Sequence, residues 1–314
     1  TVDVKDATVG VGLEVSQFSI SEAGSPQITV TARTQEPAVG DQTVDLNISG
    51  LNITASDYAL SNTRITIPSG QTTGSVTLQI LDDQLVESAT ELLGITMSNL
   101  SSGLALTGAD NANVTIIDND AAVISVDDVT SVEGNSGVKI YTFTVSSTMA
   151  SDQGYSVDYT TVDFSATEAD SDYDFTSGTL NFSGQLNETH TVAVTVRGDR
   201  KVELDELFTL QLSNIQSGNN AVNLGIGGDH GVGTITNNDS GTISIDDVTL
   251  AEGNAGDTSF VFTVSLDAEI GSSISLTHDT VDMTATGADS APLRVGNLQG
   301  RLGYNRRGFG EGAA

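Results

Sequence analysis

Acidic side chains recur at matching places along the chain, in three kinds of short segment. The first kind holds a glutamate in SEAG, VEGN or AEGN: Glu22, Glu133 and Glu252. The second kind reads LDDQLVESATE from Leu81 and GDRKVELDE from Gly198. The third kind reads DND at 118–120 and NND at 237–239. Carboxylate oxygens from several segments are the ligands that a hard divalent cation such as calcium prefers.

The chemistry of these segments favours calcium over other metals. Two like charges 4 Å apart repel by about 1 kcal/mol in water and about 4 kcal/mol at an effective dielectric constant of 20, so a bound dication would stabilise such a group. Histidine and cysteine are missing from the segments, which argues against zinc and copper. No segment fits an EF-hand loop. Any single aspartate could instead be a turn residue or a solubilising group, but recurrence at matching positions favours ligands.

The overall charge points to the same kind of partner. The formal net charge is −31, with 42 acidic and 11 basic residues. Such a chain repels nucleic acid and anionic lipid surfaces, so we expect neither as a partner, and no apolar run is long enough to insert into a membrane. The chain has no cysteine, which excludes disulfides and thiolate metal sites.

The chain is built from repeats. NDAAVISVDDVTSVEGN from Asn119 returns as NDSGTISIDDVTLAEGN from Asn238, 119 residues later. A diverged copy comes first, where SDYAL from Ser56 matches SDYDF from Ser171. The predicted units are 1–120, 121–240 and a truncated third copy, 241–290, joined by segments too short to be flexible tethers.

Within a unit, apolar residues recur every second position. The runs YTFTV from Tyr141, THTVAVTVR from Thr189 and LFTLQLS from Leu207 all alternate in this way, and so do Val76, Leu78 and Ile80. Alternation is typical of strands buried on one face, and about seven strands per unit predict an all-β fold of tandem immunoglobulin-like antiparallel β-sandwiches. The acidic segments fall at strand ends, where the loops of a sandwich gather at its poles.

These segments together resemble the Calx-beta module, which is found in sodium–calcium exchangers, integrin beta-4 and many large bacterial surface proteins. The match is fullest in the middle copy, with SVEGNSG from Ser131, the stretch from Asp163 to Gly184, VTVRGDRKVELDELFTLQLSN from Val194 and GVGTITNND from Gly231. The resemblance implies a calcium cluster at the end where one module meets the next. Its implied ligands in the middle copy are Glu133, Asp163, Asp199, Glu203, Glu206 and Asp239.

The resemblance also ranks the copies. Strong calcium-binding members have consecutive aspartates where the middle copy has Gly198-Asp199 and the triplet 237–239, so weak or incomplete binding is expected there. The first copy keeps Asp82, Asp83, Glu87, Glu91, Asp118 and Asp120, with one extra residue before Glu91, and lacks an acid that matches Asp163. We therefore expect the first copy to be the better site. The third copy retains Glu252 and Asp282.

The stretch 291–314 departs from the repeat pattern. It is rich in glycine and arginine and replaces the strands that the pattern requires after Asp282. It is either a natural extension or the product of a frameshift, and we favour the frameshift because the codons of LRVGNLQ permit YESATSR in the next frame. We expect the third copy to be disordered or misfolded beyond about residue 290 and to form no complete site.

The sequence favours a binding protein over an enzyme. His190, His230 and His278 lie in separate contexts without a nucleophile, and paired acids without tryptophan platforms are weak support for a glycosidase. We predict a non-catalytic calcium-binding region of a large secreted or cell-surface protein, acting as a calcium-stiffened stalk or adhesion module. One alternative is a glycan- or protein-binding accessory module of an extracellular enzyme. Another is the calcium-sensing loop of a membrane exchanger.

Overall fold

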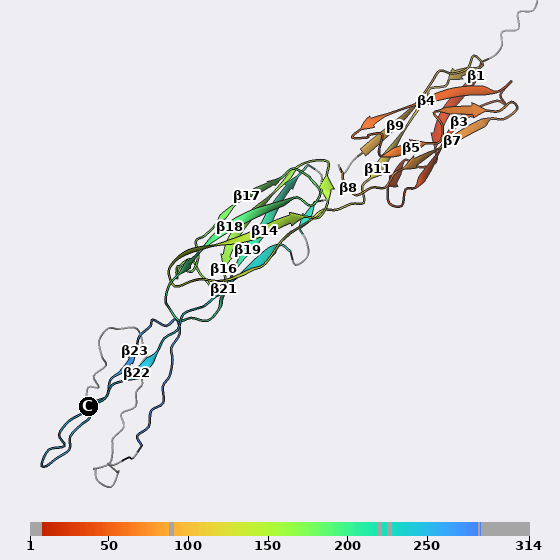
Figure 1. Cartoon of the computed structure of the whole chain (residues 1–314). Coiled ribbons are helices and arrows are strands. Elements are labelled where there is room, and N and C mark those ends of the chain that lie inside the picture. Colours follow the sequence, from red (N-terminus) through yellow and green to blue (C-terminus); the bar gives the residue numbers. More distant parts are fainter. Residues whose placement is uncertain (1–7, 88–90, 219–221, 225–227, 282, 284–314) are drawn as a thin grey trace, which may run out of the picture.

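The computed structural model describes residues 8–87, 91–218, 222–224, 228–281 and 283. These residues form β-strands and no helix. None of them therefore belongs to a helix that could span a membrane. Two β-sandwiches follow one another along the long axis of the molecule, and a smaller β region lies beyond them (Figure 1). The predicted all-β tandem architecture is confirmed.

The first module consists of two five-stranded sheets. One sheet contains, in order, β10 (Leu104–Leu106), β1 (Val9–Val15), β3 (Gln27–Thr34), β7 (Thr73–Ile80) and β5 (Tyr58–Leu60). The other contains β2 (Ser19–Ser21), β11 (Asn111–Ile117), β9 (Glu91–Ser98), β4 (Gln42–Leu51) and β6 (Arg64–Ile67). Most pairs are antiparallel, but β1 runs parallel to β10 and β2 runs parallel to β11. The chain therefore crosses between the two sheets after Val15.

The second module repeats this plan. One sheet contains, in order, β18 (Thr189–Gly198), β14 (Gly137–Ser147), β12 (Val123–Val126) and β20 (Asn223–Leu224). The other contains β13 (Val129–Val132), β21 (His230–Thr236), β19 (Glu206–Ser217), β16 (Tyr155–Asp163) and β17 (Ser177–Phe182). Again the first part of the module divides between the sheets, because β12 pairs with β14 whereas β13 runs parallel to β21.

Alternate residues of the strands fill each core, as the period of two predicts. The apolar positions singled out in the sequence are all buried: Val76, Leu78, Ile80, Tyr141, Phe143, Val145, Val192, Val194, Val196, Phe208, Leu210 and Leu212. In the second module, Phe208 stacks on Tyr173 with ring centroids 4.5 Å apart and meets Phe143 edge-on. Gly233 passes directly over this ring, since a Cβ atom there would lie 2.4 Å from Phe208.

The third module is incomplete among the described residues, as expected. It forms a two-stranded sheet of β22 (Ile243–Ile245) and β23 (Val264–Leu266). Its alternating apolar residues Ile245, Phe260 and Phe262 are exposed, although their counterparts in the second module are buried. Those counterparts are covered by further strands, which the described residues of the third module do not form. The predicted tail, 291–314, lies outside the described residues.

Candidate metal centres

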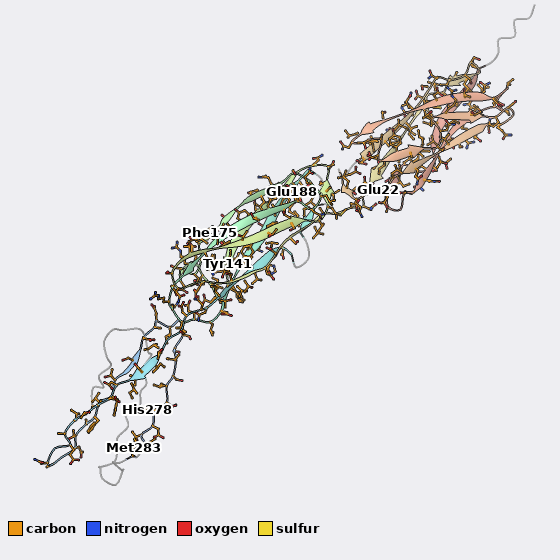
Figure 2. The ribbon with its side chains drawn as sticks, in the orientation of Figure 1. Glu22, Tyr141, Phe175, Glu188, His278 and Met283 are labelled. Atoms are coloured by element: carbon orange, nitrogen blue, oxygen red, sulfur yellow. The ribbon has the colours of Figure 1, made fainter. Side chains whose placement is uncertain are left out.

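Both complete modules bring their acidic side chains to one pole. In the first module the acids follow β2, β7 and β11 and begin β9, and in the second they follow β13, β18 and β21 and begin β19. Because antiparallel strands reverse direction, segments far apart in sequence end at the same edge of the sandwich. Glu22 marks this pole in the first module, at the end that faces the second (Figure 2).

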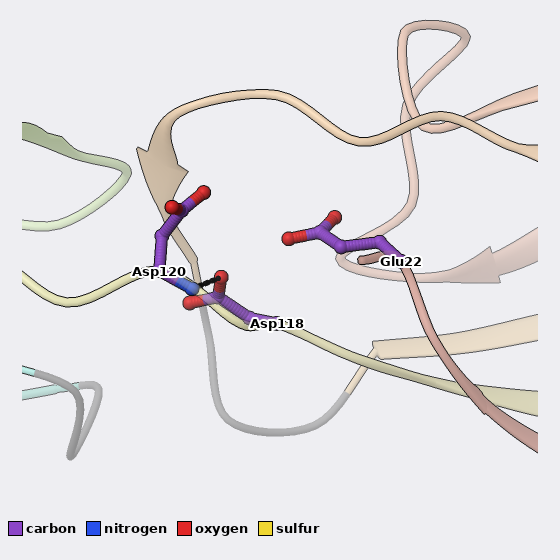
Figure 3. Close-up of side chains that lie close together, drawn as sticks. All are labelled: Glu22, Asp118 and Asp120. Carbon is purple, nitrogen blue, oxygen red and sulfur yellow. Dashed lines mark hydrogen bonds between the residues drawn. The ribbon is translucent and has the colours of Figure 1, made fainter. Parts of the chain in front are cut away.

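An outer cluster in the first module contains Glu22, Asp118 and Asp120. One carboxylate oxygen from each residue lies within 4.8 Å of the others, and Figure 3 shows the three side chains turned toward a common space. The backbone N–H of Asp120 donates to Oδ1 of Asp118 at 2.8 Å. The N–H of Asn119 donates to Oε1 of Glu22 at 3.4 Å. The DND segment is thus folded so that its aspartates face the glutamate.

An inner cluster in the same module contains Asp57, Glu87 and Glu91, all of them buried. Oδ2 of Asp57 accepts the backbone N–H of Thr54. The N–H of Glu87 donates to Oδ2 of Asp118 at 2.9 Å and so joins the inner cluster to the outer one. Sequence reasoning missed Asp57, although it lies in the repeated SDY segment that the alignment of copies had already identified.

The second module also has two clusters, but its outer cluster draws on different positions of the repeat. Its outer cluster contains Glu133, Asp199 and Glu203, and its inner cluster contains Asp172, Glu203 and Glu206. Asp172 is the counterpart of Asp57, because both accept a backbone N–H through Oδ2 in the SDY segment. Glu203 belongs to both clusters, so the second module has fewer carboxylates to share between them.

Burial raises the pKa values of five glutamates in these clusters. In the first module, burial followed by the charges of neighbouring acids raises the pKa of Glu87 to about 8 and that of Glu91 to about 7. Burial also raises the pKa of Glu22 to about 7, assisted by Asp118. In the second module the same cause raises the pKa values of Glu133 and Glu206 to about 7. The folded clusters therefore disfavour the ionised carboxylates unless a cation is present.

Several buried carboxylate oxygens have no hydrogen-bond partner among the described residues. They are Oε2 of Glu91, Oδ2 of Asp120, Oε1 of Glu133 and Oδ2 of Asp239. A buried polar atom without a partner is energetically unfavourable, so such oxygens favour a site that binds a cation. The donor set consists of carboxylate oxygens without histidine or cysteine. This set fits calcium, which binds six to eight oxygens in variable geometry.

The other predicted ligands take different positions. Asp82 and Asp83 lie at the edge of the first module's clusters, where Asp82 accepts the N–H of Gly24 at 2.7 Å and Asp83 adds its charge to Glu22. Asp163 accepts the hydroxyl of Tyr173 at 2.5 Å and lies outside the four clusters. Asp172, nine residues later, joins the inner cluster instead.

The third module contributes no described cluster. Glu252 is exposed, and its backbone carbonyl accepts the hydroxyl of Thr258 at 2.5 Å. Asp282 lies outside the described residues. The ligand roles predicted for these two residues remain predictions.

Family comparison agrees with the repeats and their geometry. The Calx-beta domain matches the chain three times, over residues 5–120, 118–241 and 236–291. The chain belongs to the Calx-beta family. The third match stops short of a full domain, in agreement with the incomplete third module.

Solved structures of similar proteins include domains of Calx. CBD12 from CALX1.2, known from a crystal structure, is 17% identical in sequence to this chain. The match covers 66% of this chain and 80% of that chain, with a TM-score of 0.32. The apo-form Calx CBD1 domain is 20% identical, with 38% and 100% covered and a TM-score of 0.32. The Calx CBD2 domain is 13% identical, with 37% and 85% covered and a TM-score of 0.29. No match was found among the curated proteins.

The matched regions are Calx-beta modules, which are not catalytic domains. The histidines do not join the acidic clusters: Nε2 of His190 lies 3.0 Å from Glu188, and Nδ1 of His230 lies 3.0 Å from Asp229. The glycine-rich residues 228–233 lead into β21, and no helix follows them in the described part of the chain. It therefore lacks the helix N-terminus on which phosphate-binding loops depend.

The first two Calx-beta modules join through the segment that carries Glu87 of the inner acidic cluster. Within this segment, β8 (Leu85–Val86) pairs in parallel with β15 (Ala150–Ser151) of the second module. Val86 is fully buried and belongs to the second module's core. The N–H of Asp152 donates to the carbonyl of Val86 at 3.0 Å, and the charge of Asp152 raises the pKa of Glu91. The second module thus reaches the candidate site of the first.

The junction between the second and third modules has a similar plan, but one acidic residue of the first junction is replaced. Val202 forms a parallel bridge with Ile270 of the third module, and Gly271 donates to the carbonyl of Val202 at 3.0 Å. Gly271 therefore stands where the first junction has Asp152. A cleft of about 590 Å³ opens beside this bridge and is lined by acids, amides and the basic residues Arg200 and Lys201.

Proposed function

We propose that this chain is a non-catalytic, calcium-binding Calx-beta repeat region of a large secreted or cell-surface protein. In this role, calcium at the module poles holds successive modules in line, so that the array forms a stiff stalk or presents an adhesive surface. The observation that carries the proposal is the pair of three-carboxylate clusters at the junction pole of each complete module, of which the inner cluster of the first module is fully buried.

The first module supports calcium binding best. Its inner cluster would contribute Asp57, Glu87 and Glu91, and its outer cluster would contribute Glu22 together with two aspartates of the DND segment. Bound calcium supplies positive charge that offsets the repulsion among these acids. The unpaired Oε2 of Glu91 supplies a ready ligand atom inside the buried inner cluster.

The junction gives this binding a mechanical consequence. Glu87 lies next to Val86, whose side chain is in the core of the second module. A ligand that orders the loop at Glu87 would therefore also hold Val86 in place. Asp152 adds negative charge to the same region from the second module, so neutralisation by a cation would favour the joined arrangement of the two modules.

The secreted or surface location that we propose sets the affinity expected of such a site. Extracellular calcium modules commonly have a Kd of about 10⁻⁴ to 10⁻³ M, which suits the millimolar calcium outside cells. At a hundredfold excess over Kd, one site would add about 2.7 kcal/mol to the free energy of unfolding.

Calorimetric titration of the chain with calcium tests the proposal. We expect saturable binding and a higher melting temperature in calcium than in EGTA, with magnesium as the comparison ion because it demands a tighter octahedral site. X-ray scattering in calcium and in EGTA tests the mechanical part, and we expect a longer, less variable particle in calcium. Equal melting temperatures in calcium and in EGTA would reject calcium binding. An unchanged scattering profile would reject the stalk.

A further inference from the structure

The second module has an edge strand that is neither covered nor charged. β17 lies at one end of its sheet and pairs with β16 on one side only (Figure 1). The N–H of Thr161 donates to the carbonyl of Thr176 at 2.9 Å. Main-chain groups alternate in direction along an antiparallel strand, so those of Ser177, Thr179 and Asn181 point away from β16. In the described part of the chain, β17 is therefore the longest edge strand without a hydrogen bond on its outer side.

The corresponding strand of the first module, β6, is shielded by the opposite sheet. A Cβ atom at Gly74 of β7 would lie 2.1 Å from the carbonyl oxygen of Thr66, so the two backbones touch at that point. His190 stands at the position of Gly74 in the second module, since each lies two residues before a buried valine. Its ring meets Phe182 edge-on, with centroids 4.6 Å apart. β18 makes no comparable approach to β17, so the outer side of that strand stays accessible.

β17 also lacks the features that keep edge strands from pairing. Such strands are usually short, or they carry charged side chains or proline. β17 spans six residues, SGTLNF, and contains neither a charge nor a proline. The carboxylate of Asp158 on the neighbouring strand accepts the hydroxyl of Thr179 at 2.6 Å and the amide of Asn214 at 2.7 Å, so hydrogen bonds hold it over the face of the sheet. In a chain with a net charge of −31, this strand is thus a place where two copies can meet without opposing acids.

The sequence of β17 is complementary to itself. An antiparallel pair centred on Thr179 would place Ser177 of one copy opposite Asn181 of the other. These three residues carry the outward main-chain groups, and their exposed polar side chains can bond to one another across the pair. Just beyond the strand, Asp174 of one copy would lie opposite Gly184 of the other. No acid therefore opposes an acid along the contact.

We propose that β17 is a self-association edge, at which two copies of this chain pair their second modules through antiparallel β17 strands. The pairing joins the two five-stranded sheets into one continuous sheet. The contact is small, so the dimer is weak and reversible. Repulsion between two chains of net charge −31 opposes it, so association strengthens as salt rises. β17 lies outside the acidic clusters, so the inference does not rest on the proposed function.

Sedimentation equilibrium of the full chain in EGTA, at low and at high salt, tests the inference. We expect a monomer–dimer equilibrium with a lower Kd at high salt. Thr179→Pro removes the central outward N–H from both copies and no main-chain hydrogen bond inside the module, so Kd should rise by about tenfold or more. Thr179→Val keeps this N–H and loses only the hydroxyl, so it should associate like the unmodified chain. A monomer at every concentration, or undiminished association of T179P, would overturn the inference.

Charge variants test the register of the pair at high salt, where the overall charge is screened. Ser177→Asp combined with Asn181→Asp would bring acids opposite each other and should abolish the dimer. Ser177→Lys combined with Asn181→Asp would bring opposite charges together and should restore it. Both side chains are exposed, so the melting temperature of either double variant should match that of the unmodified chain. Equal association of the two double variants would overturn the inference.

Hydrogen–deuterium exchange of the full chain follows the edge itself. We expect protection of β17 to increase with chain concentration, because its outward N–H groups become bonded only in the dimer. T179P should remove this dependence and T179V should keep it. Protection of β17 at every concentration would mean that a segment of the same chain covers the edge, and it would overturn the inference.

Discussion

Val86 and Ser151 are paired across the first junction, although they belong to different modules. Val86 is fully buried among residues of the second module, so one module supplies part of its neighbour's core. Asp152 follows Ser151 and adds its charge to Glu91 of the first module. The residues that pack the joint therefore lie within a few positions of residues that belong to the candidate site.

Replacement of Val86 should weaken the joint. We expect Val86→Ala to lower the free energy of unfolding of the second module by about 2 kcal/mol, since it leaves a small cavity in the core. Urea unfolding measures this change, and X-ray scattering should show a broader range of particle lengths. Val39→Ala is the control, because Val39 is 83% exposed. Equal effects of the two substitutions would contradict the importance of the joint.

The calcium-free first module should become less stable as the pH rises. The folded-state pKa values of Glu22 and Glu91 are about 7 and that of Glu87 is about 8, all above the usual 4.5. Below about pH 4.5 both states are protonated and this contribution is fully present; it is lost as the pH rises through the folded-state values. Urea unfolding in EGTA between pH 5 and pH 8 checks the direction.

Calcium should change that pH dependence. Carboxylates must be ionised to bind the ion, so binding strengthens as the pH rises. In saturating calcium we expect stability to hold steady or to increase over the same range. A parallel decrease in calcium and in EGTA would mean that these glutamates do not bind the ion.

Glu91→Gln should have opposite effects in the two conditions. In EGTA the substitution removes a buried charge from the inner cluster, so the melting temperature should rise by a few degrees. In calcium it removes a ligand, so calorimetry should show affinity lower by about tenfold or more. Glu36→Gln is the matched control, since Glu36 is exposed and lies outside the clusters. A loss of stability in both conditions would indicate a packing role only.

Substitution of Asn237 tests our expectation that the second module is the weaker site. Asn237 occupies the place of Asp118, because each accepts the N–H of the residue two positions later. Asn237→Asp should therefore tighten calcium binding by the second module by about tenfold. Asn181→Asp on the exposed face of β17 is the charge-matched control. An unchanged Kd would show that the amide at position 237 does not limit binding.

Gly198→Asp should instead damage the second module. A Cβ atom at Gly198 would lie 2.3 Å from the carbonyl oxygen of Gly134 and 2.8 Å from that of Glu133. We expect a loss of about 1–3 kcal/mol in stability, as for other overpacked sites. Thermal unfolding checks this expectation, and wild-type stability in the variant would contradict it. The missing aspartate of this module thus has a steric reason.

The sequence by itself determined the repeats, the strands and the composition of the site. Alternating apolar residues indicate strands whichever loops connect them, and the recurrence of acids at strand ends indicates a shared pole. Calx-beta membership also followed from the sequence and was confirmed by the family matches. The split of the first strand between two sheets was not predicted, because a short strand such as β2 carries too few residues to reveal its partner.

The tertiary structure alone decided which acids meet. Asp163 and Asp172 lie nine residues apart in one segment, and only the folded loop shows that Asp172 joins the cluster while Asp163 bonds to Tyr173. The same holds for Val86, which reads as an ordinary loop residue but is buried in the core of the next module. Its role depends on contacts between segments distant in sequence, and such contacts depend on how the loops fold, which residue type and spacing alone do not reveal.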